Sequence, residues 1–188
     1  MNAKQKIFQS RAEKNKKYTH TSLEMETSTH FPMLIKTVQM TEGPVIELGT
    51  GMFSTPLLHW LMFGSGRKLI SCESYPHYLD FAKKFENKDH EVRFVKDWAT
   101  EKFDDGHYSV VFIDHSIAKR AHTRGDDAAR FKDIADFVVL HDAGPNSHAK
   151  YGYDKIYPLF KYRHDWTGNK VNTTVLSNFI DVTLWPKD

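Results

Sequence analysis

The sequence has a single cysteine, no long apolar run and almost no net charge, and each shortage excludes a class of protein. Cys72 alone cannot form an intrachain disulfide or a cysteine-based zinc site, which is typical of a reducing compartment. The longest apolar stretch, 56–63, is broken by His59 and is far shorter than the roughly 18 residues that span a bilayer. Because the lysine-rich start of the chain has no apolar signal segment, we expect a cytoplasmic protein without a membrane span.

What is present is enough for one globular domain. A chain of 188 residues fits the usual domain scale of about 100 to 200 residues, and 40% hydrophobic residues can form a core. The charge is uneven, because residues 1–17 hold six Lys and Arg against Glu13, a net +5, and the rest carries about −3. We expect a basic extension over 1–27 and a single domain over 28–188. A mildly acidic domain argues against a nucleic-acid partner and confines any polyanion contact to the extension.

Short apolar runs alternate with amphipathic segments, the pattern of a parallel sheet covered by helices on both faces. The runs are continuous rather than alternating, as expected for strands buried on both sides. The expected strands are Val45–Leu48, Lys68–Cys72, Val92–Val95, Ser109–Ile113 and Phe137–Leu140. The expected helices are 28–39, 56–64 with Thr55 as N-cap, 74–86, 116–134 with an interruption near Gly125, and 154–160.

The end of the chain departs from this alternation. Residues 161–166 and 173–185 have strand character and are separated by the turn signal Thr167, Gly168 and Asn169. The sequence therefore predicts a doubly wound α/β fold, in which a mostly parallel seven-stranded sheet ends in an antiparallel hairpin.

The most informative segment is the strand, turn and helix of residues 45–56. Gly49, Thr50 and Gly51 form a G-x-G turn, which lets the backbone approach a ligand at the carboxyl edge of the sheet. Glu73 ends the second strand 24 residues after Gly49, where a carboxylate can accept hydrogen bonds from ribose hydroxyls. The alternative is a tight turn with a helix-capping carboxylate.

Two positions indicate which kind of nucleotide ligand such a turn binds. Ser54 stands where a dinucleotide-binding fingerprint has its third glycine. Glu47 lies two residues before the first glycine, where an acid suits a ligand with an ammonium group better than a pyrophosphate.

With these residues, the chain resembles the class I S-adenosylmethionine-dependent methyltransferases, whose first motif is E-x-G-x-G at the same strand end. The resemblance covers about residues 40–185, including the terminal hairpin. It implies S-adenosylmethionine as the cofactor, with its methionine part at the glycine turn, its ribose at the acid that ends the second strand, and its adenine beside an acid after the third. The cofactor-binding residues so implied are Glu47, Gly49, Thr50, Gly51, Ser54, Glu73, Asp97, Trp98 and Asp114.

Polar pairs follow the fourth and fifth strands, Asp114 with His115 and His141 with Asp142. Because ends of adjacent parallel strands lie about 5 Å apart, these side chains should converge beside the cofactor. Such a cluster can supply a general base for a hydroxyl or amine, or ligands for a divalent metal. We predict His115, His141 and Asp142 as catalytic residues. The alternative is that His115 hydrogen-bonds within its loop and His141 merely ends a strand.

The run Phe112–His115 resembles the metal-dependent catechol-type O-methyltransferases. That resemblance implies Mg or Mn bound by Asp114 and Asp142. It is incomplete, because Ala143 replaces the expected asparagine ligand and Lys119 lies five residues past Asp114 rather than three. The nearby Arg120, Arg124 and Arg130 are expected on a solvated helix face, with contact to an anionic acceptor as the alternative.

The sequence thus predicts methyl transfer from S-adenosylmethionine to an oxygen or nitrogen of a small-molecule acceptor. Two alternatives remain open. The incomplete metal pattern also suits a non-catalytic cofactor-binding or partner-binding module, and an NAD-dependent oxidoreductase would require the missing third glycine. The oligomeric state, a homodimer included, is not determined by the sequence.

Overall fold

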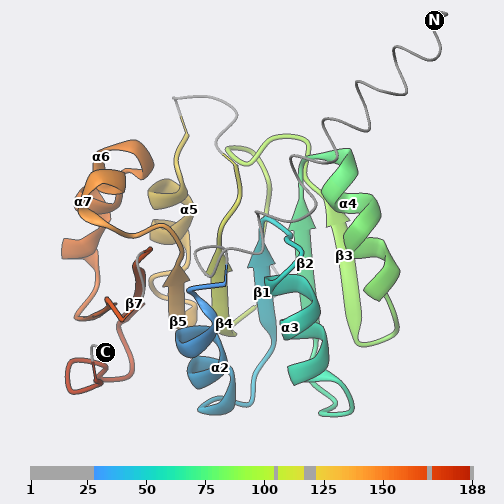
Figure 1. Ribbon diagram of the computed structural model, residues 1–188, viewed down its shortest axis with the longest axis horizontal. Coiled ribbons are helices and arrows are strands. Elements are labelled where there is room, and N and C mark those ends of the chain that lie inside the picture. The colour runs from blue at the N-terminus through green and yellow to red at the C-terminus, as the bar shows by residue number, and fades with distance from the viewer. Residues whose placement is uncertain (1–27, 104–105, 117–121, 169–170, 187–188) are drawn as a thin grey trace, which may run out of the picture.

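The computed structural model describes residues 28–103, 106–116, 122–168 and 171–186, and the predicted basic extension, 1–27, lies outside them. Its centre is a seven-stranded sheet of order β3-β2-β1-β4-β5-β7-β6 (Figure 1). Strands β1 to β5 pair in parallel, and β7 is antiparallel to both β5 and β6. The strands are β1 Val45–Leu48, β2 Leu69–Glu73, β3 His90–Phe94, β4 Tyr108–Ile113, β5 Ala135–Leu140, β6 Tyr162–Trp166 and β7 Thr173–Ser177. The predicted mostly parallel sheet with a terminal antiparallel pair is confirmed.

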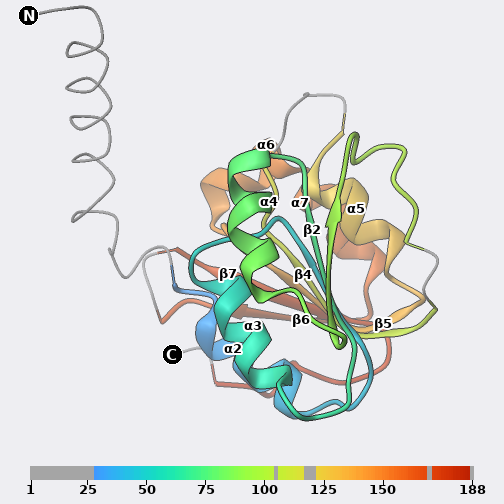
Figure 2. The ribbon, with the colours of Figure 1, turned by 90° about the vertical axis from the view of Figure 1, so that its right-hand side faces the viewer.

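Helices cover both faces of the sheet (Figures 1 and 2). Helices α2, α3 and α4 lie on one face, and α5 and α7 lie on the other. The α-helices are α2 Phe31–Gln39, α3 Ser54–Met62, α4 Pro76–Ala82, α5 Arg124–Arg130, α6 His148–Tyr151 and α7 Tyr153–Ile156. Three-residue 3-10 turns are η2 Lys83–Phe85, η3 Pro145–Ser147 and η4 Tyr157–Leu159. Among the described residues, no helix is long and apolar enough to cross a membrane.

Two-sided burial explains the continuous apolar runs. Every residue of β4 is buried, and its side chains alternate between two clusters. Val110 and Phe112 pack with residues of α2 and α3, whereas Val111 and Ile113 pack with residues of α5 and α7. Each face of the central strands is therefore hydrophobic, which is the condition for a parallel sheet between two helical layers.

The predicted helix over 116–134 is wrong in extent. Within the described residues α5 begins at Arg124, because Thr123 caps it through a reciprocal pair of hydrogen bonds with Asp126. Gly125 does not interrupt the helix but lies inside it, where a Cβ would come within 2.6 Å of the Gly152 carbonyl oxygen. Glycine is needed there so that α5 can approach the α6–α7 junction.

Three further predicted boundaries differ from the structure. Helix α3 begins at Ser54, and Thr55, the predicted N-cap, lies inside it. The predicted helix over 154–160 is divided into α7 and a 3-10 turn, and the last strand ends at Ser177 rather than at 185. The early end of β7 follows from the hydroxyl of Ser177, which accepts hydrogen bonds from the amides of Phe179 and Ile180 and turns the chain away.

Candidate active site

The register of the sheet brings the predicted residues to one edge. Leu48, the last residue of β1, is paired with Ile113 of β4, and Ile113 is paired with Leu140 of β5. The next residue on each strand, Gly49, Asp114 and His141 respectively, therefore follows at the same level. The carboxyl edge of the sheet thus places the glycine turn beside the two polar pairs.

The glycine turn lies against the loop that follows β4. Gly49 has a φ of +93°, and a Cβ at this residue would be 2.3 Å from the backbone nitrogen of His115. Its amide donates to the carbonyl oxygen of Cys72 at 2.9 Å. No other residue type fits this turn without displacing the 114–115 backbone.

Glu73 is buried and holds two turns together. One carboxylate oxygen accepts from the amide and hydroxyl of Thr50, at 2.9 and 3.1 Å. The other accepts from the amides of Ser74 and Tyr75, at 2.7 Å each. If a ribose bound here, its hydroxyls would replace some of these amide and hydroxyl groups as donors to the carboxylate of Glu73.

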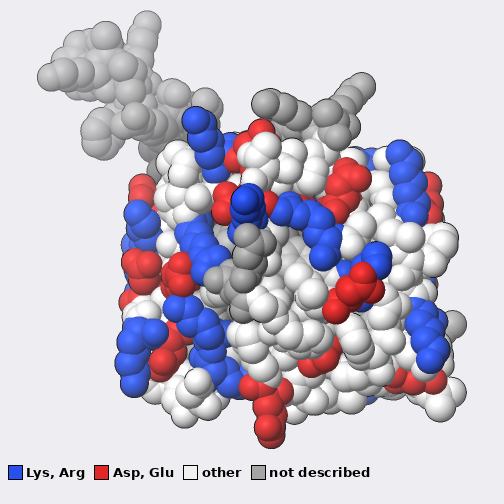
Figure 3. Space-filling view, turned by 180° about the vertical axis from the view of Figure 1, so that it is seen from behind, with Lys and Arg blue, Asp and Glu red and all other residues white. Residues whose placement is uncertain are grey.

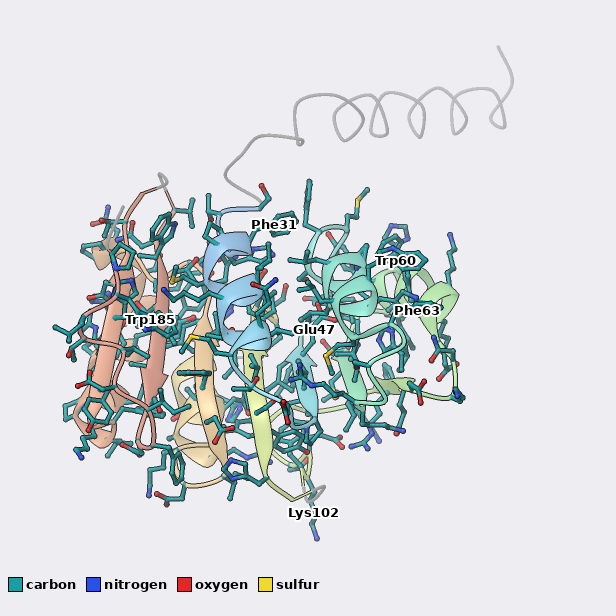
Figure 4. The ribbon with its side chains drawn as sticks, turned by 90° about the horizontal axis from the view of Figure 1, so that it is seen from below. Phe31, Glu47, Trp60, Phe63, Lys102 and Trp185 are labelled. Atoms are coloured by element: carbon teal, nitrogen blue, oxygen red, sulfur yellow. The ribbon has the colours of Figure 1, made fainter. Side chains whose placement is uncertain are left out.

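Glu47 does not reach the edge directly. It is fully buried beneath α3, where it accepts from Thr55 at 3.0 Å and from Ser71 at 2.6 Å. Figure 4 shows it between α2 and α3. Burial raises the pKa of Glu47 to about 7, against hydrogen bonds from Ser54, Ser71 and Thr55 that lower it. Its link to the glycine turn is indirect, because the Thr55 hydroxyl also accepts from the amide of Gly51 at 3.0 Å.

Trp98 and His115 form a stacked pair at this edge. Their ring centroids are 4.3 Å apart with planes 19° apart, and the Trp98 indole donates to the Ser74 hydroxyl at 3.2 Å. Asp97, the preceding residue, is exposed. The loop after β3 therefore places an exposed carboxylate next to a buried indole, where the resemblance places the adenine.

Both ring nitrogens of His115 have partners. Nε2 lies 2.7 Å from a carboxylate oxygen of the fully buried Asp127, and Nδ1 lies 3.2 Å from the Ser116 carbonyl oxygen. Asp127 is also held by His122 at 2.9 Å and Arg130 at 3.0 Å. This arrangement orients the imidazole beside Trp98 and ties its two nitrogens to Asp127 of α5 and to the backbone of its own loop.

Asp114, His141 and Asp142 converge as the strand ends predict. Each offers a ligand atom within 4.8 Å of the others. His141 Nδ1 lies 3.2 Å from Asp114 Oδ2, and its Nε2 lies 3.1 Å from the hydroxyl of Thr29. Burial lowers the pKa of His141, but the charge and hydrogen bond of Asp114 outweigh it and raise the value overall.

Arg124 joins these residues, a position that the sequence analysis did not predict. Its guanidinium donates to the carbonyl oxygens of His115, Asp114 and His141 and to a carboxylate oxygen of Asp142, at 2.7 to 3.4 Å. It also forms an ion pair with a carboxylate oxygen of Asp114 at 2.9 Å. The side chain is buried over the ring of Tyr151 rather than on a solvated helix face. His141 and Arg124 together hold the pKa of Asp114 at about 2, although burial acts to raise it.

Asp142 has an unusual backbone. Its φ of +53° is the one positive value at a non-glycine position among the described residues. Such strain persists where the surrounding contacts enforce it, and it is concentrated at functional sites. One Asp142 oxygen accepts from Arg124 and from the Tyr151 hydroxyl at 3.3 Å, and the side chain is one third exposed.

His30 is a second residue that the sequence analysis missed. It precedes α2 and is 2% exposed, packed against Phe31, Phe112 and His141 with ring centroids 4.8 to 5.1 Å away. Neither ring nitrogen has a hydrogen-bond partner among the described residues. Burial lowers its pKa to about 3, so the ring is neutral at physiological pH. Only the docking of α2 on β4 and β5 brings this histidine to the edge, and no local motif signals that docking.

The donor set fits a magnesium site poorly. Mg²⁺ prefers an oxygen-rich octahedral shell, whereas this cluster offers one imidazole and two carboxylates that already bind Arg124. The guanidinium supplies the positive charge that a cation would bring. We therefore derive no step through a metal at this site.

Comparison with known proteins places the fold. No protein-family model matches the chain, and no curated protein matches its sequence. The solved structures with a similar fold include the N-terminal domain of human METTL16, also solved in complex with SAH, with a TM-score of 0.54 and 12 to 13% identity over 80% of this chain and 69% of that one. The human methyltransferase 10 domain containing protein has a TM-score of 0.54 and 13% identity, covering 82% and 84%. Spermidine synthase from Thermotoga maritima has a TM-score of 0.55 and 16% identity, covering 79% and 58%.

The chain therefore has the Rossmann-like fold of class I methyltransferases, as predicted. At these identities the similarity shows the fold alone. The narrower resemblance to catechol-type enzymes stays a prediction.

Proposed function

We propose that this protein binds S-adenosylmethionine at the carboxyl edge of its sheet and transfers the methyl group to an oxygen or nitrogen of a small molecule. The observation that carries the proposal is the position of the Gly49 turn, in backbone contact with the loop that leads into the Asp114, His141 and Asp142 cluster. A related fold solved in complex with SAH, in human METTL16, supports the choice of cofactor.

In this proposal the cofactor lies along the edge from β1 to β3. The methionine part occupies the turn of Gly49, Thr50 and Gly51, and Glu47 and Ser54 support that turn from within. Glu73 binds the ribose, and the adenine lies beside Asp97 and Trp98, in the loop after β3. Asp114, next to the turn, contacts the cofactor at the reacting end.

His141 is the proposed general base. The negative charge of Asp114, 3.2 Å from Nδ1, favours the proton on that nitrogen, which leaves the lone pair on Nε2, directed away from the carboxylates. Nε2 already approaches a hydroxyl, that of Thr29 at 3.1 Å, which is the geometry that an acceptor hydroxyl would need. S-adenosylmethionine, when bound, would supply the methyl group on an activated sulfur, and Nε2 would take the proton of the acceptor atom that receives this group, with S-adenosylhomocysteine as the other product.

The other predicted catalytic residues have supporting roles in this mechanism. The Asp142 oxygen that does not bind Arg124 orients the acceptor, and His115 fixes the loop that carries Asp114. Because the sulfonium is already activated, proximity and orientation supply most of the rate.

A small acceptor is favoured over nucleic acid by the charge of the domain. Residues 28–188 carry a net charge of −1. On the face shown in Figure 3, basic and acidic side chains are interspersed rather than gathered by sign. We extend the proposal to a cytoplasmic enzyme with one methyltransferase domain over 28–188.

The test has two stages. Calorimetry with S-adenosylhomocysteine and with NAD separates the cofactors, and binding of NAD alone would refute the proposal. Release of S-adenosylhomocysteine is then followed over phenols, sugars, amines and short RNA, with His141→Ala as the control variant. Turnover on RNA alone would overturn the small-molecule acceptor, and cofactor binding without turnover on any acceptor would favour the non-catalytic module.

A further inference from the structure

A second polar cluster lies beneath α3, and only its first member, Glu47, has a role in the proposed function. It runs from Glu47 on β1 through Ser71 on β2 to His90 on β3, and ends at His59 on α3. The Ser71 hydroxyl lies 2.6 Å from Glu47 Oε2 and 2.9 Å from His90 Nε2, and His90 Nδ1 lies 3.1 Å from His59 Nδ1. The two histidines are 2% and 9% exposed. A chain of buried polar groups in an otherwise apolar layer requires an explanation.

One arrangement of these hydrogen bonds leaves Nδ1 of His90 without a proton. When Glu47 is ionised, Ser71 donates its one proton to Glu47 and its oxygen accepts the proton of His90 Nε2. In that arrangement the lone pair of His90 is on Nδ1, the nitrogen that faces His59. A carboxylate that orients a histidine through its far nitrogen is the arrangement found behind metal-bound histidines, here with Ser71 between them.

The two Nδ1 atoms face one another at a separation suited to a shared ion. Two nitrogens bound to one tetrahedral zinc at 2.0–2.1 Å are about 3.3 Å apart. The observed 3.1 Å needs only a small opening. On binding of the ion, the proton of His59 would move from Nδ1, where it lies between the two rings, to Nε2. Both rings stay neutral, so no proton is lost.

A cavity of about 190 Å³ adjoins the pair. Both histidines line it, together with Met62, Phe63, Leu69 and Asn87. It lies at the amino ends of β2 and β3, so it is at the opposite edge of the sheet from Gly49. Figure 4 shows Phe63 at the outer end of α3 beside Trp60. The cavity gives room for water or a small ligand on the open side of an ion.

We propose that His59 and His90 bind one transition-metal ion, such as Zn²⁺ or Cu²⁺, through their Nδ1 atoms, with the remaining positions filled from the cavity. Imidazole nitrogens suit these ions, and a site with two protein ligands leaves open positions. The site is separate from the cofactor edge and does not depend on the proposed function.

Calorimetry with Zn²⁺ on the full chain tests the site. His59→Asn should weaken binding by at least about tenfold, because half of the protein ligands are lost. His77→Asn, at an exposed histidine, should leave binding unchanged and controls for surface chelation. Equal Zn²⁺ affinity of the wild type and His59→Asn would overturn the proposal.

A spectroscopic test does not depend on the folding of a His59 variant. Electron paramagnetic resonance of Cu²⁺ bound to His141→Ala, which lacks the imidazole of the candidate active site, should show coupling to two imidazole nitrogens. Loss of the bound copper signal in that variant would assign the ion to the other cluster and refute the inference. S-adenosylhomocysteine affinity is expected to be unchanged by Zn²⁺.

Discussion

Replacing Arg124 by methionine should destabilise the protein more than any other single charge removal considered for this site. The change removes all five donors from the ends of β4 and β5 and leaves Asp114 without one of its two cationic partners. Breaking a buried ion pair by removing one partner costs about 3–5 kcal/mol. For a chain of this size, such a loss lowers the melting temperature by about 6–20 °C.

Urea unfolding followed by circular dichroism measures this loss directly. Lys68→Met is the matched control, because Lys68 pairs with Glu91 at 3.0 Å with both side chains more than one third exposed. An exposed pair contributes about 0–1 kcal/mol. If Arg124→Met lowered the free energy of unfolding no more than Lys68→Met does, the conclusion that the buried ion pairs of Arg124 stabilise the fold would be refuted.

Acid titration gives a second check on the same residue. The folded pKa of Asp114 is about 2, below its ordinary value of 3.8. Its contribution to the free energy of unfolding is therefore complete above pH 3.8 and is lost as the pH falls through 2. In Arg124→Met this acid-dependent loss should be smaller, because one of the charges that lower the pKa is gone.

Four further predictions address the cofactor turn, the base, the metal and the buried acid. Gly49→Ala should abolish S-adenosylhomocysteine binding in calorimetry, because the added Cβ meets the His115 backbone at 2.3 Å; near-native affinity would contradict the turn geometry. The rate constant kcat/KM should rise with pH through an apparent pKa above 6.5, the ordinary value of histidine, and His141→Ala should lack this limb. Turnover should survive treatment with EDTA, since Arg124 supplies the charge at the site, and loss of activity restored by Mg²⁺ would establish the metal instead. The pKa of Glu47 rises from 4.5 to about 7 on folding, so the free energy of unfolding should fall by about 3 kcal/mol as the pH rises through that interval; the difference between wild type and Glu47→Gln in urea unfolding isolates this effect.

The strands and the carboxyl edge of the sheet were predictable because both follow from the local pattern of apolar and polar residues. The residues of β4 and β5 form continuous apolar runs, and a polar residue directly after each run marks the end of the strand. Parallel pairing then sets Asp114 beside His141 without any knowledge of side-chain packing. The convergence of the polar pairs is thus a consequence of topology.

Side-chain roles were less accessible, because they depend on partners far along the chain. The buried position of Arg124 follows from the cap at Thr123, which aims α5 at the sheet edge, and sequence alone favoured a solvated face. The orientation of His115 depends on Trp98 and Asp127, from different elements. Tertiary contacts of this kind carry no periodic signal.

The glycine pair where α5 meets the α6–α7 junction has a consequence for the range of acceptors in the proposed reaction. A side chain at Gly152 would come within 2.7 Å of the Thr123 hydroxyl, just as one at Gly125 would meet the Gly152 carbonyl. The Gly152 backbone therefore rests on the backbone of Gly125 and on the Thr123 side chain, and the aromatic residues of α6 and α7 are fixed to the helix whose first residue, Arg124, binds the loops after β4 and β5. If these aromatic residues line the proposed acceptor site, exchange of their side chains can change its selectivity, but the site has little freedom to widen for a bulkier acceptor.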